Sequence, residues 1–188
     1  SPSVVGVLRM DGYRIGDVGA AAVANWLAGP TCRATEVSLA AGDVTAKALE
    51  FVEAERKDIG EKGGAALGKA LLTNLSLHTL DLRSNSLSSV TTGRSSAAML
   101  AFARALHVNS TLTALDLSGN MLSHSDVTLL ADALRRNHSL TRLNLAKTRT
   151  SKEGLHRTRT RTRHRTRTHT NADAAVCVVQ RFNLWRSV

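Results

Sequence analysis

Apolar and polar residues alternate in a fixed order over the middle of the chain. Residues 77–87 and 112–122 both follow the pattern L-x-x-L-x-L-x-x-N-x-L, and a further copy starts at Leu140. Leu80 and Leu82 alternate with polar neighbours, which predicts a short strand with one buried face and one solvated face. The recurrence predicts a scaffold built from similar units.

An asparagine ends the strand segment of each intact copy, at Asn85 and at Asn120. The chain must turn away from the strand there, and a side-chain amide can satisfy backbone groups that no neighbouring strand pairs. The same frame extends backwards through weaker copies, so that six copies start at residues 5, 34, 49, 77, 112 and 140. The copy at 34–48 is too short to contain a full helix.

The second half of each unit has the spacing of an amphipathic helix. The predicted buried positions are Val127, Leu130, Ala131 and Leu134, with the equivalents Ala20, Val23, Ala24 and Leu27; Gly64, Leu67, Gly68 and Leu71; and Met99, Phe102, Ala103 and Leu106. Asn74, Asn109 and Asn137 follow three of these helices, and an asparagine can end a helix in the left-handed conformation. Each unit is therefore predicted to be strand, turn, helix and turn.

These motifs resemble the ribonuclease-inhibitor type of leucine-rich repeat, which also occurs in NOD-like receptors. The resemblance covers residues 4–155 and departs from the family at Tyr13, Gly42 and Lys57, which replace the turn asparagine or cysteine. It implies an α/β solenoid, a short horseshoe with parallel strands on the concave side and helices on the convex side. We accordingly predict a repeat domain of five to six units over residues 1–155, with the last unit interrupted.

Charge divides the chain differently. The net charge of +10 belongs largely to residues 156–170, an alternation of Arg, Thr and His that we predict to be disordered, whereas residues 1–155 are nearly balanced. We interpret this segment as coding sequence extended through a simple nucleotide repeat, and residues 171–188 as an unassigned tail. Because the chain opens with Ser1 rather than Met, we expect it to be a fragment of a longer protein.

Composition sets further bounds. Aromatic residues make up 3% of the chain, so the core must be aliphatic. Cys32 and Cys177 show no disulfide or metal spacing and favour a reducing compartment, from which we expect a cytoplasmic protein. The longest apolar run near the end, residues 174–179, is too short to span a membrane, and we expect no membrane partner.

Motifs for chemistry are weak. Residues 63–70 nearly match a phosphate-binding loop, but Ala70 stands where a hydroxyl is needed and Leu67 follows the helical spacing. Three glycosylation sequons begin at the predicted helix-stop asparagines, and the histidines outside the tail lack metal-ligand spacing. We therefore predict no enzymatic activity, no cofactor and no metal site.

The predicted concave face supplies the candidate binding residues. Strand alternation places on it Phe51, Glu53, Glu55, Thr79, Asp81, Arg83, Asp116, Ser118, Arg142 and Asn144. The central column is Glu53, Asp81, Asp116 and Asn144. Either this is a solvated polar face, relieved by the two arginines, or it is an acidic stripe that steers a basic partner. Repulsion between neighbouring carboxylates argues against a stabilising role.

We predict that the protein acts as a monomeric, non-catalytic scaffold for a protein partner. The alternative is a nucleic-acid or acidic-surface binder that uses the Arg/Thr-rich segment 156–170. That segment contains no aromatic residue on which bases could stack, so such binding would depend on phosphate contacts and on salt.

Overall fold

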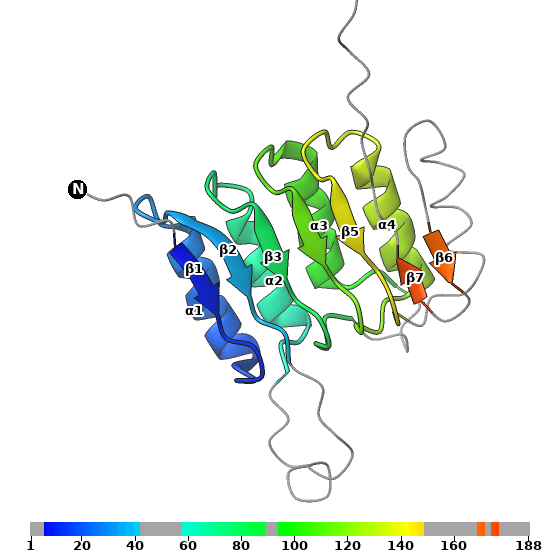
Figure 1. Cartoon of the computed structure of the whole chain (residues 1–188), viewed down its shortest axis with the longest axis horizontal. Helices are drawn as coiled ribbons and strands as arrows, with labels where there is room; N and C mark the ends of the chain where they lie inside the picture. Colours follow the sequence, from blue (N-terminus) through cyan, green and yellow to red (C-terminus); the bar gives the residue numbers. More distant parts are fainter. Residues whose placement is uncertain (1–5, 42–57, 89–93, 149–168, 172–173, 177–188) are drawn as a thin grey trace, which may run out of the picture.

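The computed structural model describes residues 6–41, 58–88, 94–148, 169–171 and 174–176. Strands and helices alternate along the main body of the chain (Figure 1). In chain order the elements are β1 (Gly6–Arg9), α1 (Gly16–Ala28), β2 (Ala34–Ser38), α2 (Glu61–Ala70), β3 (Thr79–Asp81), α3 (Ala97–Val108), β4 (Ala114–Asp116), α4 (His124–Leu134), β5 (Arg142–Asn144), β6 (His169–Asn171) and β7 (Ala174–Val176).

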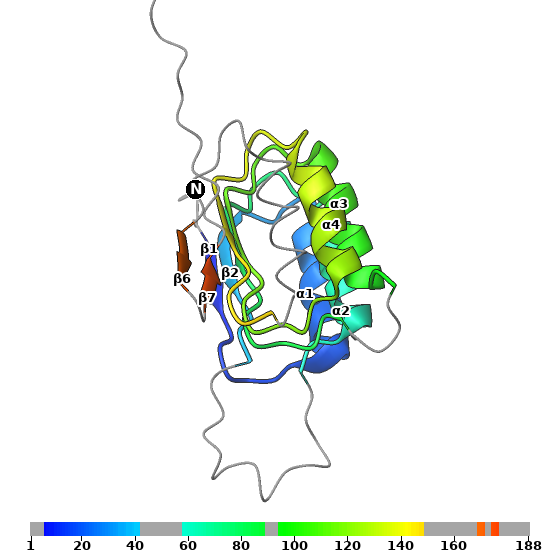
Figure 2. The same cartoon turned by 90° about the vertical axis from the view of Figure 1, so that its right-hand side faces the viewer.

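Strands β1 to β5 form one parallel sheet in sequence order. Helices α1 to α4 form a single layer on one face of this sheet (Figure 2). Strands β6 and β7 pair antiparallel with each other, and β7 lies beside β5. None of the helices in the described part of the chain is long and apolar enough to span a membrane. The predicted α/β class is confirmed.

The core lies between the sheet and the helical layer. The strand register places one residue from each strand in a row that faces the helices: Leu8, Val37, Leu80, Leu115 and Leu143. The predicted helical positions face this row, and all of them except the half-buried Val23 are buried. The apolar spacing of the sequence therefore identified both layers of the core.

The sheet has no strand between β2 and β3, where the copy predicted to start at residue 49 would have placed one. Strand β2 pairs directly with β3, with Val37 opposite Leu80. The next element that the structure describes after β2 is the helix α2, and residues 42–57, which include most of the predicted copy, lie outside the described residues. Ile59 nevertheless occupies a buried core position, as its frame predicted.

Asparagines fill the turns that follow β3 and β4, as predicted. The Asn85 amide donates to the carbonyls of Leu39 and Leu82, and its oxygen accepts from the Ile59 amide. Asn120 makes the corresponding bonds one unit further on. Each side chain thus satisfies backbone groups of two neighbouring units, which fixes the spacing between the units.

The helix-stop asparagines act differently from the prediction. Asn74, Asn109 and Asn137 have no positive φ, and Asn109 is extended with φ −72° and ψ 125°. Each side-chain oxygen instead accepts two backbone amides of the next turn, while its amide donates back to the preceding unit. The side-chain bonds remove the need for a left-handed residue. Because these amide nitrogens are buried and bonded, the three sequons are closed to glycosylation in the folded chain.

Left-handed backbone occurs one position before the turn asparagines. Ser84 has φ 57° and Gly119 has φ 72°, and Gly12 and Lys147 occupy the equivalent positions with φ 79° and 55°. The chain reverses there between the end of a strand and the segment that leads to the helix. This recurrent turn gives the sheet face the same outline in successive units.

Candidate functional site

Helices cover one face of the parallel sheet, and on its other side the described residues place only the β6–β7 pair, beside β5 (Figure 2). Parallel sheets in most folds have both faces buried. Successive side chains of a strand point to opposite faces. The open face therefore carries the residues directly before and after each buried residue of the row. This open face is the candidate site because its backbone is regular and the described helices leave it uncovered.

Three predicted site residues stand side by side on this face. The register places Asp81 opposite Asp116, and Asp116 opposite Asn144. Ser38, not the predicted Glu53, occupies the neighbouring position on β2. Phe51, Glu53 and Glu55 lie outside the described residues.

The same three residues bond to the backbone. Asp81 Oδ1 accepts the Arg83 amide at 3.0 Å, Asp116 Oδ1 accepts the Ser118 amide at 2.9 Å, and Asn144 Oδ1 accepts the Ala146 amide at 3.0 Å. Each side chain therefore fixes the backbone where its strand ends. The argument from the sequence against a stabilising role considered only repulsion between carboxylates and left out these bonds to backbone amides.

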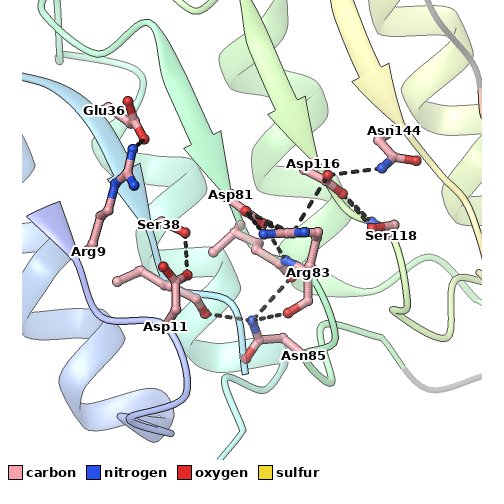
Figure 3. A network of polar contacts seen from close by, with 12 residues as sticks. Arg9, Asp11, Glu36, Ser38, Asp81, Arg83, Asn85, Asp116, Ser118 and Asn144 are labelled. Atoms are coloured by element: carbon pink, nitrogen blue, oxygen red, sulfur yellow. Dashed lines mark hydrogen bonds and ion pairs between the residues drawn. The ribbon is translucent and has the colours of Figure 1, made fainter. Parts of the chain in front are cut away.

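Arg83 lies at the centre of the polar network (Figure 3). Its Nε donates to both Asp81 carboxylate oxygens at 2.8 and 3.0 Å, and its Nη2 is 2.8 Å from Asp81 Oδ2. The distance from Nε to Asp116 Oδ2 is 3.9 Å. The hydrogen bond and the charge of Asp81 raise the pKa of Arg83, with smaller contributions from Asp116 and Asp11. The guanidinium is therefore held charged and in a defined orientation.

Asp116 is shared among several partners in the same network. Its Oδ1 accepts the Ser118 hydroxyl at 2.6 Å, and its Oδ2 accepts the Asn144 amide at 2.9 Å. Asn144 thus connects β5 to β4 through side chains as well as through the backbone ladder. The network spans three adjacent strands.

Exposure decides which charge a partner would meet. The side chain of Arg83 is 52% exposed, whereas those of Asp81 and Asp116 are 17% and 26% exposed. Arg142 on β5 is also exposed. The carboxylates lie beneath the guanidinium of Arg83, so the predicted acidic stripe is not the outermost layer of this face.

The first two strands extend the polar face beyond the predicted residues. Arg9 Nη2 donates to Glu36 at 2.9 Å, and the Ser38 hydroxyl donates to Asp11. The sequence prediction missed these four residues because it drew its candidates only from the copies that start at residue 49 or later. The frame itself placed Arg9 and Ser38 at the positions equivalent to Asp81, and this spacing could have found them.

The near match to a phosphate-binding loop lies within α2. Gly63 packs towards α1 and Gly64 and Gly68 pack towards α3, since a Cβ at Gly68 would meet Ala101 Cβ at 2.7 Å. These glycines allow close helix packing and form no phosphate cradle. The described residues contain no group of His, Cys, Asp or Glu side chains placed to hold a metal ion.

Comparisons with known proteins show the fold. No family model matches the chain, and no curated protein matches it. The tropomodulin C-terminal domain of Caenorhabditis elegans aligns with a TM-score of 0.55 at 16% identity, over 85% of this chain and 84% of that one. A structure of leiomodin-1 actin-binding site 2 aligns with a TM-score of 0.46 at 19% identity, over 54% of this chain and 56% of that one. This chain therefore spans little more than half of the leiomodin structure.

These comparisons correct the predicted family. A solved structure that aligns over most of both chains is a tropomodulin C-terminal domain, not a ribonuclease-inhibitor-type leucine-rich repeat or a NOD-like receptor. The periodic leucines are buried as expected. However, any parallel sheet covered by one helical layer needs apolar residues at the strand and helix spacings. The spacing therefore predicted the α/β units and did not identify the family.

Proposed function

We propose that the protein is a non-catalytic recognition module that binds a protein partner on the open face of its sheet. The observation that carries this proposal is the half-exposed guanidinium of Arg83, held over Asp81 on a sheet face that the described helices leave uncovered. An open face of this kind does not enclose a small substrate. It offers instead a broad area of ordered polar side chains.

The partner would present hydrogen-bond acceptors to this face. Arg83 has more N–H donors than Asp81 can accept, and an arginine that is already oriented loses little rotamer freedom on binding. Arginines are also enriched among the residues that dominate binding energy at protein interfaces. A partner carboxylate or an exposed backbone carbonyl beside Arg83 and Arg142 fits this chemistry.

Two other functions have weaker support. The leiomodin-1 structure is an actin-binding site by name, but a similarity with a TM-score of 0.46 supports no partner for this chain. Nucleic-acid binding through residues 156–170 remains a prediction, because that segment lies outside the described residues. We therefore define the partner by its chemistry and the site by the sheet face.

Site-specific photo-crosslinking tests the proposal directly. A photoreactive amino acid at Thr79, on the open face, should capture the partner in cells, whereas the same amino acid at the exposed Val18 of α1 should not. The partner identified by mass spectrometry is then titrated against the purified full chain. Arg83→Ala should weaken its affinity about 30-fold, the effect of removing an interface hot spot of about 2 kcal/mol.

Asp81→Asn is the matched control for orientation. An asparagine oxygen can still accept the Arg83 amide, so the backbone bond remains while the ion pair is lost. We expect weaker binding with a nearly unchanged melting temperature. Capture from Val18 but not from Thr79, or full affinity of the Arg83→Ala chain, would contradict the proposal.

A further inference from the structure

A second surface lies along the edge where helices end and the next strands begin, the upper edge in Figure 1. Large apolar side chains are exposed at this edge in three consecutive units. We call it the helix-end rim and define its apolar part by Trp26, Leu72, Leu75 and Val108, which are 45%, 44%, 76% and 64% exposed. The open sheet face and the rim are different surfaces, because none of these residues belongs to a strand.

Hydrogen bonds between the turns make this apolar part continuous. The Asn74 amide donates to the Leu27 carbonyl at 2.8 Å, which places the turn with Leu72 and Leu75 against the end of the helix with Trp26. Asn109 donates to the Leu71 and Asn74 carbonyls at 2.9 and 3.0 Å. The turn that follows Val108 is therefore bound to the same segment.

The rim changes character at the fourth unit. Asn137 repeats the bonds of Asn109, but the residues before and after it are Arg135, Arg136 and His138, all of which are exposed. Basic residues also flank the apolar part. Lys69 is exposed three residues before Leu72, and Arg104 is exposed four residues before Val108 on the same helix face. The rim thus combines an apolar row with exposed positive charge.

Fold stability explains the charges but not the apolar row. Cations near helix ends interact favourably with the helix dipole, and single exposed apolar residues are ordinary. A polar residue at each exposed apolar position would leave the buried asparagine bonds intact, because those bonds use backbone carbonyls and amides. Apolar residues adjacent in three units therefore indicate a surface that another molecule covers.

We propose that the helix-end rim binds an acidic amphipathic helix of a partner protein. Neighbouring helices of the layer pack with their axes about 8–10 Å apart. Residues seven apart along an α-helix are separated by about 10.5 Å. A helix laid across the rim can therefore place one apolar residue against each of three successive units, and acidic residues between them can face Lys69, Arg104 and Arg136.

An anionic membrane is the competing occupant. Membrane anchors project apolar side chains beyond the protein surface. Trp26 and Leu72 instead keep more than half of their surface covered by the fold. Leu75 and Val108 project further, but they form one row with Trp26 and Leu72. An occupant that contacts all four must pack down onto the protein surface, and this favours a protein helix.

A display selection tests the proposal on the full chain. A library of random 16-residue peptides is selected on the parent protein and counter-selected on the Leu75→Ser/Val108→Ser variant. We expect enriched peptides with an acidic excess and apolar residues seven apart. Their affinity, measured by fluorescence anisotropy, should fall at least about tenfold on the double variant.

Two control variants separate this surface from others. Val18→Ser removes an even more exposed apolar side chain away from the rim, and Arg83→Ala removes the centre of the open sheet face; neither should change peptide affinity. Failure to enrich acidic peptides, or equal affinity for the double variant, would overturn the proposal. Loss of binding in Arg83→Ala would place the peptide on the sheet face and would also overturn it. Leu75-dependent binding to phosphatidylserine vesicles, without peptide binding, would overturn it by assigning the rim to membranes.

Discussion

The two halves of the sheet hold their turns in different ways. After β3 and β4, buried asparagines fill the turns, as Asn85 and Asn120 show. In the first unit the equivalent residue is Tyr13, which is 76% exposed. Similarly, α2, α3 and α4 are each followed by a bonded asparagine, whereas Gly29 follows α1 and its amide bonds to the Trp26 carbonyl.

The first half uses a longer-range contact where the asparagines are missing. Asp17 at the start of α1 accepts the amides of Gly60 and Gly63 at 2.7 and 2.8 Å, and so caps the first turn of α2. This carboxylate therefore joins the start of α2 to the start of α1. Repeated side-chain bonds therefore give the second half its regularity, while the first half depends on individual contacts.

The largest expected effect tests whether the second half carries more of the stability. Leu117 is fully buried, and Leu117→Ala should reduce the free energy of unfolding by about 2–5 kcal/mol because a cavity forms. Leu8→Ala in the half-buried edge strand β1 should cost less than half as much. Urea unfolding of both variants measures this.

Asp116→Ala, which removes partly buried hydrogen bonds, should cost about 1 kcal/mol. Equal losses at residues 116 and 117 would refute the assigned strand phase.

Substitution of a turn residue should lower stability in the second half of the sheet, where the turn residue is a bonded asparagine, but not in the first unit. Asn120→Ala leaves the carbonyls of Leu82 and Leu117 and the amide of Leu87 without this partner, and should cost about 1–3 kcal/mol. Tyr13→Ala at the equivalent exposed position should change stability by no more than about 0.5 kcal/mol. Thermal melts of the two variants compare them. A large loss at residue 13 would mean that the first turn has contacts equivalent to those of Asn120.

Two substitutions at the left-handed turn position should have smaller effects on stability, and these effects should differ in sign. Gly119→Ala introduces strain of about 1–2 kcal/mol, and its Cβ would lie 2.9 Å from Ser84 Oγ and 3.2 Å from Ser84 Cα. Ser84→Gly relieves the same strain one unit earlier and should be neutral or slightly stabilising, since glycine also increases the entropy of the unfolded chain. Opposite signs in chemical denaturation support a shared turn geometry, and a loss in both variants would argue against it.

The smallest effect concerns local opening at the end of the sheet. Strand β5 has a parallel neighbour on one side only, and α4 is the last described helix of the layer. We expect amides of residues 140–148 to exchange hydrogen faster than those of residues 112–139, with no change in global stability. Hydrogen exchange read by mass spectrometry would show this. Uniform protection would indicate that another segment, such as the β6–β7 pair, covers this end.

Local pattern was sufficient wherever the same side chain has the same role in successive units. The apolar spacing predicted the buried positions of α1 to α4, and the alternation around Leu80 and Leu115 predicted which side chains reach the open face. The frame also predicted a strand at residues 49–55 between β2 and β3, but β2 pairs directly with β3. Strand pairing joins segments that are far apart in the chain, and spacing along the chain does not contain that information.

The charged residues of the open face also show which features the sequence predicts and which depend on the folded chain. The sequence was enough to predict that Asp81, Asp116 and Asn144 lie in one row, because the period of a strand and the interval between units leave them no other face. What this row presents to solvent became clear from the folded chain. Arg83 folds over Asp81, and Asn144 and Ser118 bond to Asp116, so carboxylates that form an acidic column in the sequence become the base that orients a guanidinium. Sequence order could not supply this arrangement, because the direction of the Asp116 side chain depends on neighbouring strands, and its partner Asn144 is 28 residues away.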